Sequence, residues 1–122
     1  MSHSILHTVS IALAERSYPI LIGTNIFDQA TTYAALPSAT SALIVSNTTV
    51  APLYAQRLRA AIAPKYAAVE LVVLPDGEQY KNWETLNLIF DALLGHASDR
   101  KCIVYALGGG VVGDMTGFAA AC

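Results

Sequence analysis

A glycine-rich run near the end of the chain constrains its fold most strongly. Four apolar residues within 103–107 lead directly into Gly108, and residues 108–113 have the spacing Gly-x-Gly-x-x-Gly. Glycines permit left-handed dihedrals and a close approach of the backbone to a ligand, and the N–H groups of a following helix point toward an anion. The run therefore predicts a strand, a phosphate-binding turn and a helix. The alternative is a tight turn whose glycines only allow the strand and the helix to pack.

This run departs in two ways from the common dinucleotide-binding fingerprint. That fingerprint usually opens the first strand–helix unit, and an acidic residue that binds the ribose follows it about 20 residues later. Here the glycines come in the last predicted unit, and the sequence stops at Cys122. The ribose contact must therefore lie elsewhere in the chain or beyond its end.

The composition limits the class of protein. The chain has 122 residues, the length of one ordinary domain, and we expect a single domain over residues 1–122. Its formal net charge is −2 with only 13% charged residues, so neither nucleic acid nor an anionic membrane surface is a predicted partner. No apolar stretch reaches about 18 residues and the N-terminus lacks the features of a signal peptide, which favours a cytoplasmic location.

The cysteines and histidines indicate neither a disulfide framework nor a metal site. Cys102 and Cys122 are too few for such a framework. His3, His7 and His96 do not have the spacing of metal ligands. We therefore assign no catalytic and no metal-ligating residue within this sequence.

Hydrophobic periodicity predicts an α/β protein. A hairpin of two strands, 9–13 and 18–22 with a turn at 15–17, precedes a short helix at 26–30. Three strand–helix units follow, because continuous apolar runs are typical of parallel strands buried on both faces. Their strands are predicted at 41–45, 69–74 and 103–107, and their helices are marked by Leu53, Leu58 and Ile62, by Leu86, Ile89, Phe90, Leu93 and Leu94, and by the segment 111–122. This order predicts a Rossmann-like, mostly parallel sheet flanked by helices, with an N-terminal β-hairpin.

Polar residues follow each of the three predicted parallel strands: Asn47 the first, Asp76–Lys81 the second and Gly108–Asp114 the third. Ligands bind at the carboxyl ends of strands in sheets of this class, so we expect these segments to form one site. Amide and carboxylate side chains can bind ribose hydroxyls, a lysine can face a phosphate, and the glycine turn can hold a pyrophosphate. Each segment also has a simpler interpretation, as a helix cap, a turn or an exposed ion pair. Asp114, expected in the first turn of the last helix, could likewise serve only the helix dipole.

The predicted last helix, 111–122, ends without a terminal glycine or a basic last turn. The strand that would complete a right-handed crossover after it is also missing. We therefore expect an incomplete domain, the N-terminal part of a longer protein. We also expect exposed apolar side chains around Val111, Val112 and Phe118, which would favour self-association.

Two long motifs occur in order along the chain. The first is Leu74-Pro75-Asp76-Gly77-Glu78-Gln79-Tyr80-Lys81, followed by Trp83-Glu84-Thr85, and the second runs from Ala106 to Ala121. Together they resemble the amino-terminal domain of the 3-dehydroquinate synthase family. The segments 15–23 and 46–48 also fit, so the resemblance covers nearly the whole chain.

The resemblance implies an enzyme that converts 3-deoxy-D-arabino-heptulosonate 7-phosphate to 3-dehydroquinate and phosphate, in the shikimate route to aromatic amino acids. It implies tightly held NAD as a recycled catalyst, and a divalent metal, zinc or cobalt, whose ligands lie beyond Cys122 in a helical second domain. We expect the full-length enzyme to be a homodimer and this chain alone to be inactive. The NAD contacts that the resemblance implies, with Asn47 near the adenosine ribose and Asp114 toward the nicotinamide end, are Asn47, Asp76, Gly77, Glu78, Gln79, Tyr80, Lys81, Gly109, Gly110, Val111, Val112, Gly113 and Asp114.

Three alternatives stay open. Another sugar-phosphate cyclase, such as 2-deoxy-scyllo-inosose synthase, shares the cofactor motifs. A glycerol-dehydrogenase-like NAD enzyme shares the architecture, but it typically has Ser where this chain has Val111. A non-catalytic nucleotide-binding module would require the gene to end near Cys122.

Overall fold

The computed structural model describes residues 4–12, 18–95 and 101–121. Its contacts divide the chain into two compact units, Met1–Ala35 and Leu36–Cys122. Several features named above lie outside the described residues: the turn predicted at 15–17, His3, the side chain of His7, His96 and Cys122.

The first unit contains the predicted antiparallel hairpin strands. β1 (Ser4–Ile11) pairs with β2 (Tyr18–Thr24) in a register that places Ile11 opposite Tyr18. β2 extends two residues beyond its predicted end, through Gly23 and Thr24.

The helix predicted at 26–30 is wrong. The chain turns there instead, and a 3-10 helix forms at Ala30–Tyr33. The Thr32 hydroxyl donates a hydrogen bond to the Ile26 carbonyl at 2.5 Å, and the Tyr33 hydroxyl donates one to the Phe27 carbonyl at 2.7 Å. The Gln29 N–H also donates to the Ile26 carbonyl at 3.2 Å, so the side-chain hydroxyls supplement the backbone hydrogen bonds of this turn.

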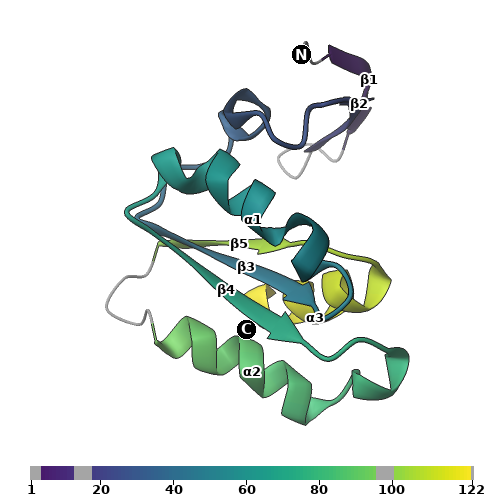
Figure 1. Cartoon of the computed structure of the whole chain (residues 1–122), viewed down its shortest axis with the longest axis vertical. Helices are drawn as coiled ribbons and strands as arrows, with labels where there is room; N and C mark the ends of the chain where they lie inside the picture. The colour runs from purple at the N-terminus through teal and green to yellow at the C-terminus, as the bar shows by residue number, and fades with distance from the viewer. Residues whose placement is uncertain (1–3, 13–17, 96–100, 122) are drawn as a thin grey trace. The chain divides into compact units, whose positions relative to one another are not determined.

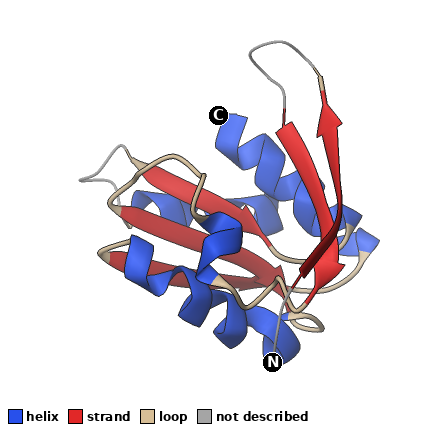
Figure 2. Ribbon diagram, turned by 90° about the horizontal axis from the view of Figure 1, so that it is seen from above, coloured by secondary structure: helices blue, strands red, loops and turns tan. Residues whose placement is uncertain are grey.

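The second unit is built on a parallel sheet of three strands. β3 (Ser41–Asn47) lies between β4 (Ala68–Leu74) and β5 (Cys102–Ala106) and runs parallel to both (Figure 2). All seven residues of β3 are buried, as a continuous apolar run predicts. The chain passes from β3 to β4 on one side and then to β5 on the other, so the order of strands reverses at β3. The predicted α/β class, with a parallel sheet and an N-terminal hairpin, is confirmed.

Helices cover both faces of this sheet (Figure 1). α1 (Ala51–Ile62) packs on β3 and β4, and a 3-10 turn that contains Pro64 follows it. α2 (Trp83–Leu94) and α3 (Gly110–Ala121) pack against each other and on the opposite face. None of the helices among the described residues is long and apolar enough to cross a membrane.

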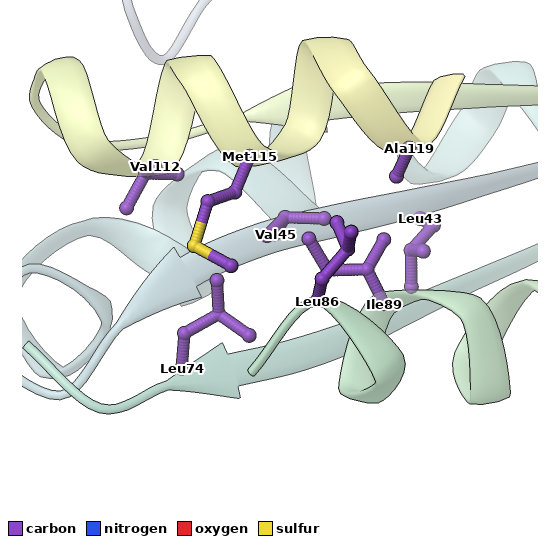
Figure 3. Packing of buried hydrophobic residues seen from close by; sticks show 8 residues of the cluster. All are labelled: Leu43, Val45, Leu74, Leu86, Ile89, Val112, Met115 and Ala119. Carbon is purple, nitrogen blue, oxygen red and sulfur yellow. The ribbon is translucent and has the colours of Figure 1, made fainter. Parts of the chain in front are cut away.

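The main hydrophobic core lies between the sheet and the pair α2 and α3 (Figure 3). Residues at every third or fourth position of each helix point inward, as an amphipathic stripe requires. The core residues are Leu43 and Val45 from β3, Leu74 from β4, Leu86 and Ile89 from α2, and Val112, Met115 and Ala119 from α3.

Three apolar residues lie differently from what the sequence predicts. Leu94 is 69% exposed because it ends α2 about 80° around the helix from Leu86. Leu53 is also exposed, since it lies about 140° around α1 from the buried Leu58. Val112, expected at the surface, is buried in the core.

Candidate functional site

The carboxyl ends of the three parallel strands meet at one edge of the sheet, as expected from their order. In the ladder Asn47 is paired with Leu74, and Val45 with Ala106. One step beyond the β3–β5 ladder, the Leu107 N–H donates to the Val45 carbonyl at 2.9 Å. The turns after all three strands are therefore held close together.

Asn47 ends β3, holds the turn that leads to α1, and contacts the loop that follows β4. Its Oδ1 accepts hydrogen bonds from the N–H groups of Thr49 at 3.1 Å and Val50 at 2.8 Å. Its Nδ2 donates to Asp76 Oδ1 at 3.3 Å. Asn47 is also largely buried. The N-cap position of α1 is Val50, which has no side-chain cap, so Asn47 caps the turn before the helix and not the helix itself. A contact of Asn47 with a ligand stays a prediction.

Asp76 is held through both of its carboxylate oxygens. Asn47 bonds Oδ1, and the Thr49 hydroxyl donates to Oδ2 at 2.5 Å. The next residue, Gly77, has a φ of 131°, and a Cβ there would lie 2.4 Å from the side chain of Gln79. Sequence reasoning did not single out Thr49 as a partner of Asp76, because such a pairing is visible only once the two turns are adjacent.

Lys81 joins this loop to α3. The loop forms a short 3-10 turn at Glu78–Tyr80, after which Lys81 Nζ donates to Asp114 Oδ2 at 2.9 Å. Glu78 Oε1 lies farther away, 3.9 Å from the same nitrogen. The hydrogen bond to Asp114, and then the charges of Asp114 and Glu78, raise the pKa of Lys81 above its ordinary value. The predicted Glu78–Lys81 pair is therefore secondary to a pair that spans two strand ends.

The expected place of Asp114 in the first turn of α3 is wrong. The helix begins at Gly110, one residue earlier than predicted, and its first turn contains no acidic residue. Asp114 lies beyond that turn, where its carboxylate meets Lys81. Its side chain is well exposed, so this surface pair has little effect on stability.

The glycine turn leads from β5 directly into α3. Gly113 donates its N–H to the Gly109 carbonyl at 3.0 Å, so the three helical N–H groups before it point to the open end of the helix. A Cβ placed on Gly109, Gly110 or Gly113 would meet nothing within 4 Å. The backbone is thus open to a ligand at this point, which fits a bound phosphate. Because the Val112 side chain is in the core, only its backbone could contact that ligand.

An open pocket of about 380 Å³ lies between the start of α2 and α3. The rings of Trp83 and Phe118, both exposed, meet edge to face across it with centroids 6.1 Å apart. Lys81 and Asp114 supply its charged side. The full lining is Lys81, Asn82, Trp83, Leu86, Asp114, Met115 and Phe118. The sequence predicted the last helix but not this pocket, because its two aromatic residues come from segments that are far apart in the chain.

Within the described parts of the chain, no three His, Cys, Asp or Glu side chains gather to hold a metal ion. The acidic and basic groups of the candidate site come from the loop after β4 and from α3.

A family described as the N-terminal domain of 3-dehydroquinate synthase matches residues 71–122. This segment is similar to that family. It contains both the loop after β4 and the glycine turn, so the resemblance seen in the sequence motifs is confirmed where two of the three strand ends lie. The 3-dehydroquinate synthase match does not extend to Asn47.

Two solved structures share the fold. Both are 2-deoxy-scyllo-inosose synthases, one of them complexed with carbaglucose-6-phosphate, NAD+ and Co2+. Each superposes with a TM-score of 0.81 at 20% sequence identity and covers 94% of this chain. The match covers 32% of the synthase chain, so this chain spans about a third of the length of the proteins that it resembles.

Proposed function

We propose that this chain forms the NAD-binding part of a sugar-phosphate cyclase of the 3-dehydroquinate synthase type. One observation carries the proposal: the loop after β4 contacts the turn after β3 through Asp76 and α3 through Lys81, beside the open glycine turn. An edge with these groups provides hydrogen-bond partners for ribose hydroxyls and phosphates in the place where such sheets bind nucleotides.

The glycine turn would hold the pyrophosphate. The first N–H groups of α3 and the positive end of its dipole favour an anion there. Gly109 and Gly110 leave the approach clear. Lys81 adds a positive charge beside this end of the helix, and its ion pair with Asp114 keeps the side chain oriented.

The two carboxylates would bind the two riboses. Asp76 has one protein hydrogen bond on each oxygen and retains lone pairs for an adenosine ribose hydroxyl, with Asn47 beside it. Asp114 would face the nicotinamide half. When bound, NAD supplies a hydride acceptor that can return the hydride. The other proposed contacts, Glu78, Gln79, Tyr80 and Val111, come from the same loop and helix start.

The proposed reaction is the conversion of 3-deoxy-D-arabino-heptulosonate 7-phosphate to 3-dehydroquinate and phosphate. The family match over residues 71–122 supports it. A 2-deoxy-scyllo-inosose synthase activity is the second candidate, favoured by the shared fold. In either case a divalent metal would be held by residues other than those described for this chain.

Calorimetric titration of the purified chain with NAD tests the cofactor assignment. We expect one NAD to bind each chain only weakly, because the sequence predicts an incomplete domain, and we expect ADP, which carries the same pyrophosphate, to compete with it. A chain that is folded by circular dichroism but gives no binding heat at millimolar NAD would contradict the proposal. For the enzyme that contains this chain, phosphate release from the heptulosonate phosphate rather than from glucose 6-phosphate, with NAD and Co2+ supplied, distinguishes the two cyclase activities.

A further inference from the structure

Ser46 makes a contact that the strand ladder does not require. It lies at the carboxyl end of β3 with 0% of its surface exposed. Its hydroxyl donates a hydrogen bond to the Leu107 carbonyl at 2.8 Å, across 61 residues of sequence. The N–H of Leu107 already donates to Val45. Leu107, the residue before the glycine turn, is thus held to β3 at both its N–H and its carbonyl.

This contact fixes the first peptide of the glycine turn. The peptide between Leu107 and Gly108 is planar and trans, so its N–H points opposite to its carbonyl. Holding the carbonyl toward Ser46 therefore directs the Gly108 N–H away from the sheet interior.

The residue that follows this peptide, Gly108, is constrained as well, because it has no room for a side chain. Gly108 has a φ of 156°, and a Cβ there would lie 3.0 Å from Val112 Cγ2. Val112 is in the core and cannot easily move aside. Only glycine therefore fits between the peptide that Ser46 holds and the packed start of α3.

We infer that Ser46 is a positioning residue that presets the glycine turn for a bound phosphate. The inference rests on the proposed NAD site, and it gives Ser46 no direct contact with the ligand. Without the hydroxyl, the Leu107–Gly108 peptide can rotate, and binding must then include the free-energy cost of restoring its direction.

Ser41 provides a matched control on the same strand. It is also buried, but its hydroxyl has no hydrogen-bond partner among the described residues. Ser41→Ala and Ser46→Ala remove the same group from β3, and only the second removes a contact with the glycine turn. Ser46→Cys is a third variant, since it keeps the volume but replaces the hydroxyl with a weak donor.

We expect Ser46→Ala and Ser46→Cys to raise the Kd for NAD about three- to tenfold, the effect of one hydrogen bond. Ser41→Ala should leave it within about twofold of the original. The core variant Ile89→Ala is destabilised but does not touch the glycine turn. Measured under conditions where it is folded, its Kd for NAD should also stay within about twofold of the original. This control separates the effect of a misplaced turn from that of lower stability. Equal NAD affinities in the Ser41 and Ser46 variants would overturn the inference.

A measurement without NAD separates this inference from the proposed function. In 1H–15N NMR spectra of the free chain, Ser46→Ala should shift the Gly108 amide signal and speed its hydrogen exchange, whereas Ser41→Ala should not. If the Gly108 signal moves but the original chain binds no NAD, the cofactor assignment fails and the positioning role stands. An unchanged Gly108 amide in Ser46→Ala would overturn the positioning role even if NAD binds.

Discussion

Lys81 donates a hydrogen bond from Nζ to Asp114 Oδ2 at 2.9 Å, and this contact joins the loop after β4 to the helix after β5. Thirty-three residues separate the two in sequence. In a sheet whose strand order is β4-β3-β5, their strands are not neighbours, so the ion pair spans the end of β3. A ligand at this edge would therefore meet both charges.

The Lys81–Asp114 pair predicts a specific dependence of stability on pH. Because the pKa of Lys81 is raised in the folded chain, its stabilising effect is fully present below the ordinary lysine pKa and is lost as pH rises through the raised value. We expect Lys81→Met to lower the urea midpoint only slightly near neutral pH, with the difference disappearing as the pH rises past the raised pKa of Lys81. Circular dichroism at a series of pH values checks this. A difference that grows with alkalinity would contradict it.

Asp114→Asn tests the same pair from the other side. If the contact is the main interaction of both side chains, the double variant Lys81→Met with Asp114→Asn should be no less stable than either single variant. Urea unfolding of the four proteins at neutral pH gives the coupling. Strictly additive losses would mean that the two residues stabilise the fold independently.

Gly110→Val should weaken NAD binding more than it lowers stability. A Cβ at Gly110 would meet nothing within 4 Å outside its own helix backbone and chain neighbours, so we expect the added side chain to enter the open space where we place the pyrophosphate. We expect at least about a tenfold rise in Kd and a change in unfolding free energy below about 1 kcal/mol. Gly117→Val is the matched control, because that site in α3 is equally open but lies two turns from the start of the helix. Equal affinities for NAD in the two variants would assign the glycines a structural role only.

Asn82 should contribute to stability as the N-cap of α2. Its side chain accepts a hydrogen bond from the Thr85 N–H at 3.0 Å. Asn82→Ala leaves that donor without its cap and should cost about 1 kcal/mol, whereas Asn82→Ser should retain most of the stability. Urea denaturation followed by circular dichroism measures both. A serine variant as unstable as the alanine variant would show that capping is not the reason.

Two apolar residues on α2 should respond very differently to the same truncation. Ile89 is fully buried in the core, so Ile89→Ala should cost about 2–5 kcal/mol. Leu94 is largely exposed, so Leu94→Ala should change the unfolding free energy by less than about 0.5 kcal/mol. Comparable losses for the two would mean that the end of α2 is covered in solution, as self-association through this face would produce.

The sheet and its helices were predictable because their signals are local. The apolar run Ser41–Val45 indicates a central strand, and Asn82 has the chemistry of a cap whatever surrounds it. The direction of individual side chains was harder to predict. The buried face of α1 is made largely of alanines, such as Ala51 and Ala55. The larger Leu53 was therefore predicted to be buried, although it is exposed.

The sequence predicted which strand ends form the candidate site, but it did not predict which side chains contact each other there. The motifs indicated the loop after β4 and the glycine turn, because each is contiguous in sequence. The bond of Thr49 to Asp76 and that of Ser46 to Leu107 join residues 27 and 61 positions apart. Such pairs follow from strand order and register, which depend on how the whole sheet assembles.

The Ser46–Leu107 bond also has a consequence for folding. β3 precedes both of its neighbours along the chain, yet its carboxyl end stays incomplete until β5 has docked beside it. Closing so long a loop delays that step relative to the contacts between β3 and β4. The glycine turn is therefore ordered only once β5 is in place. A ligand that binds this turn stabilises that step by an amount that grows with the logarithm of its concentration relative to its Kd.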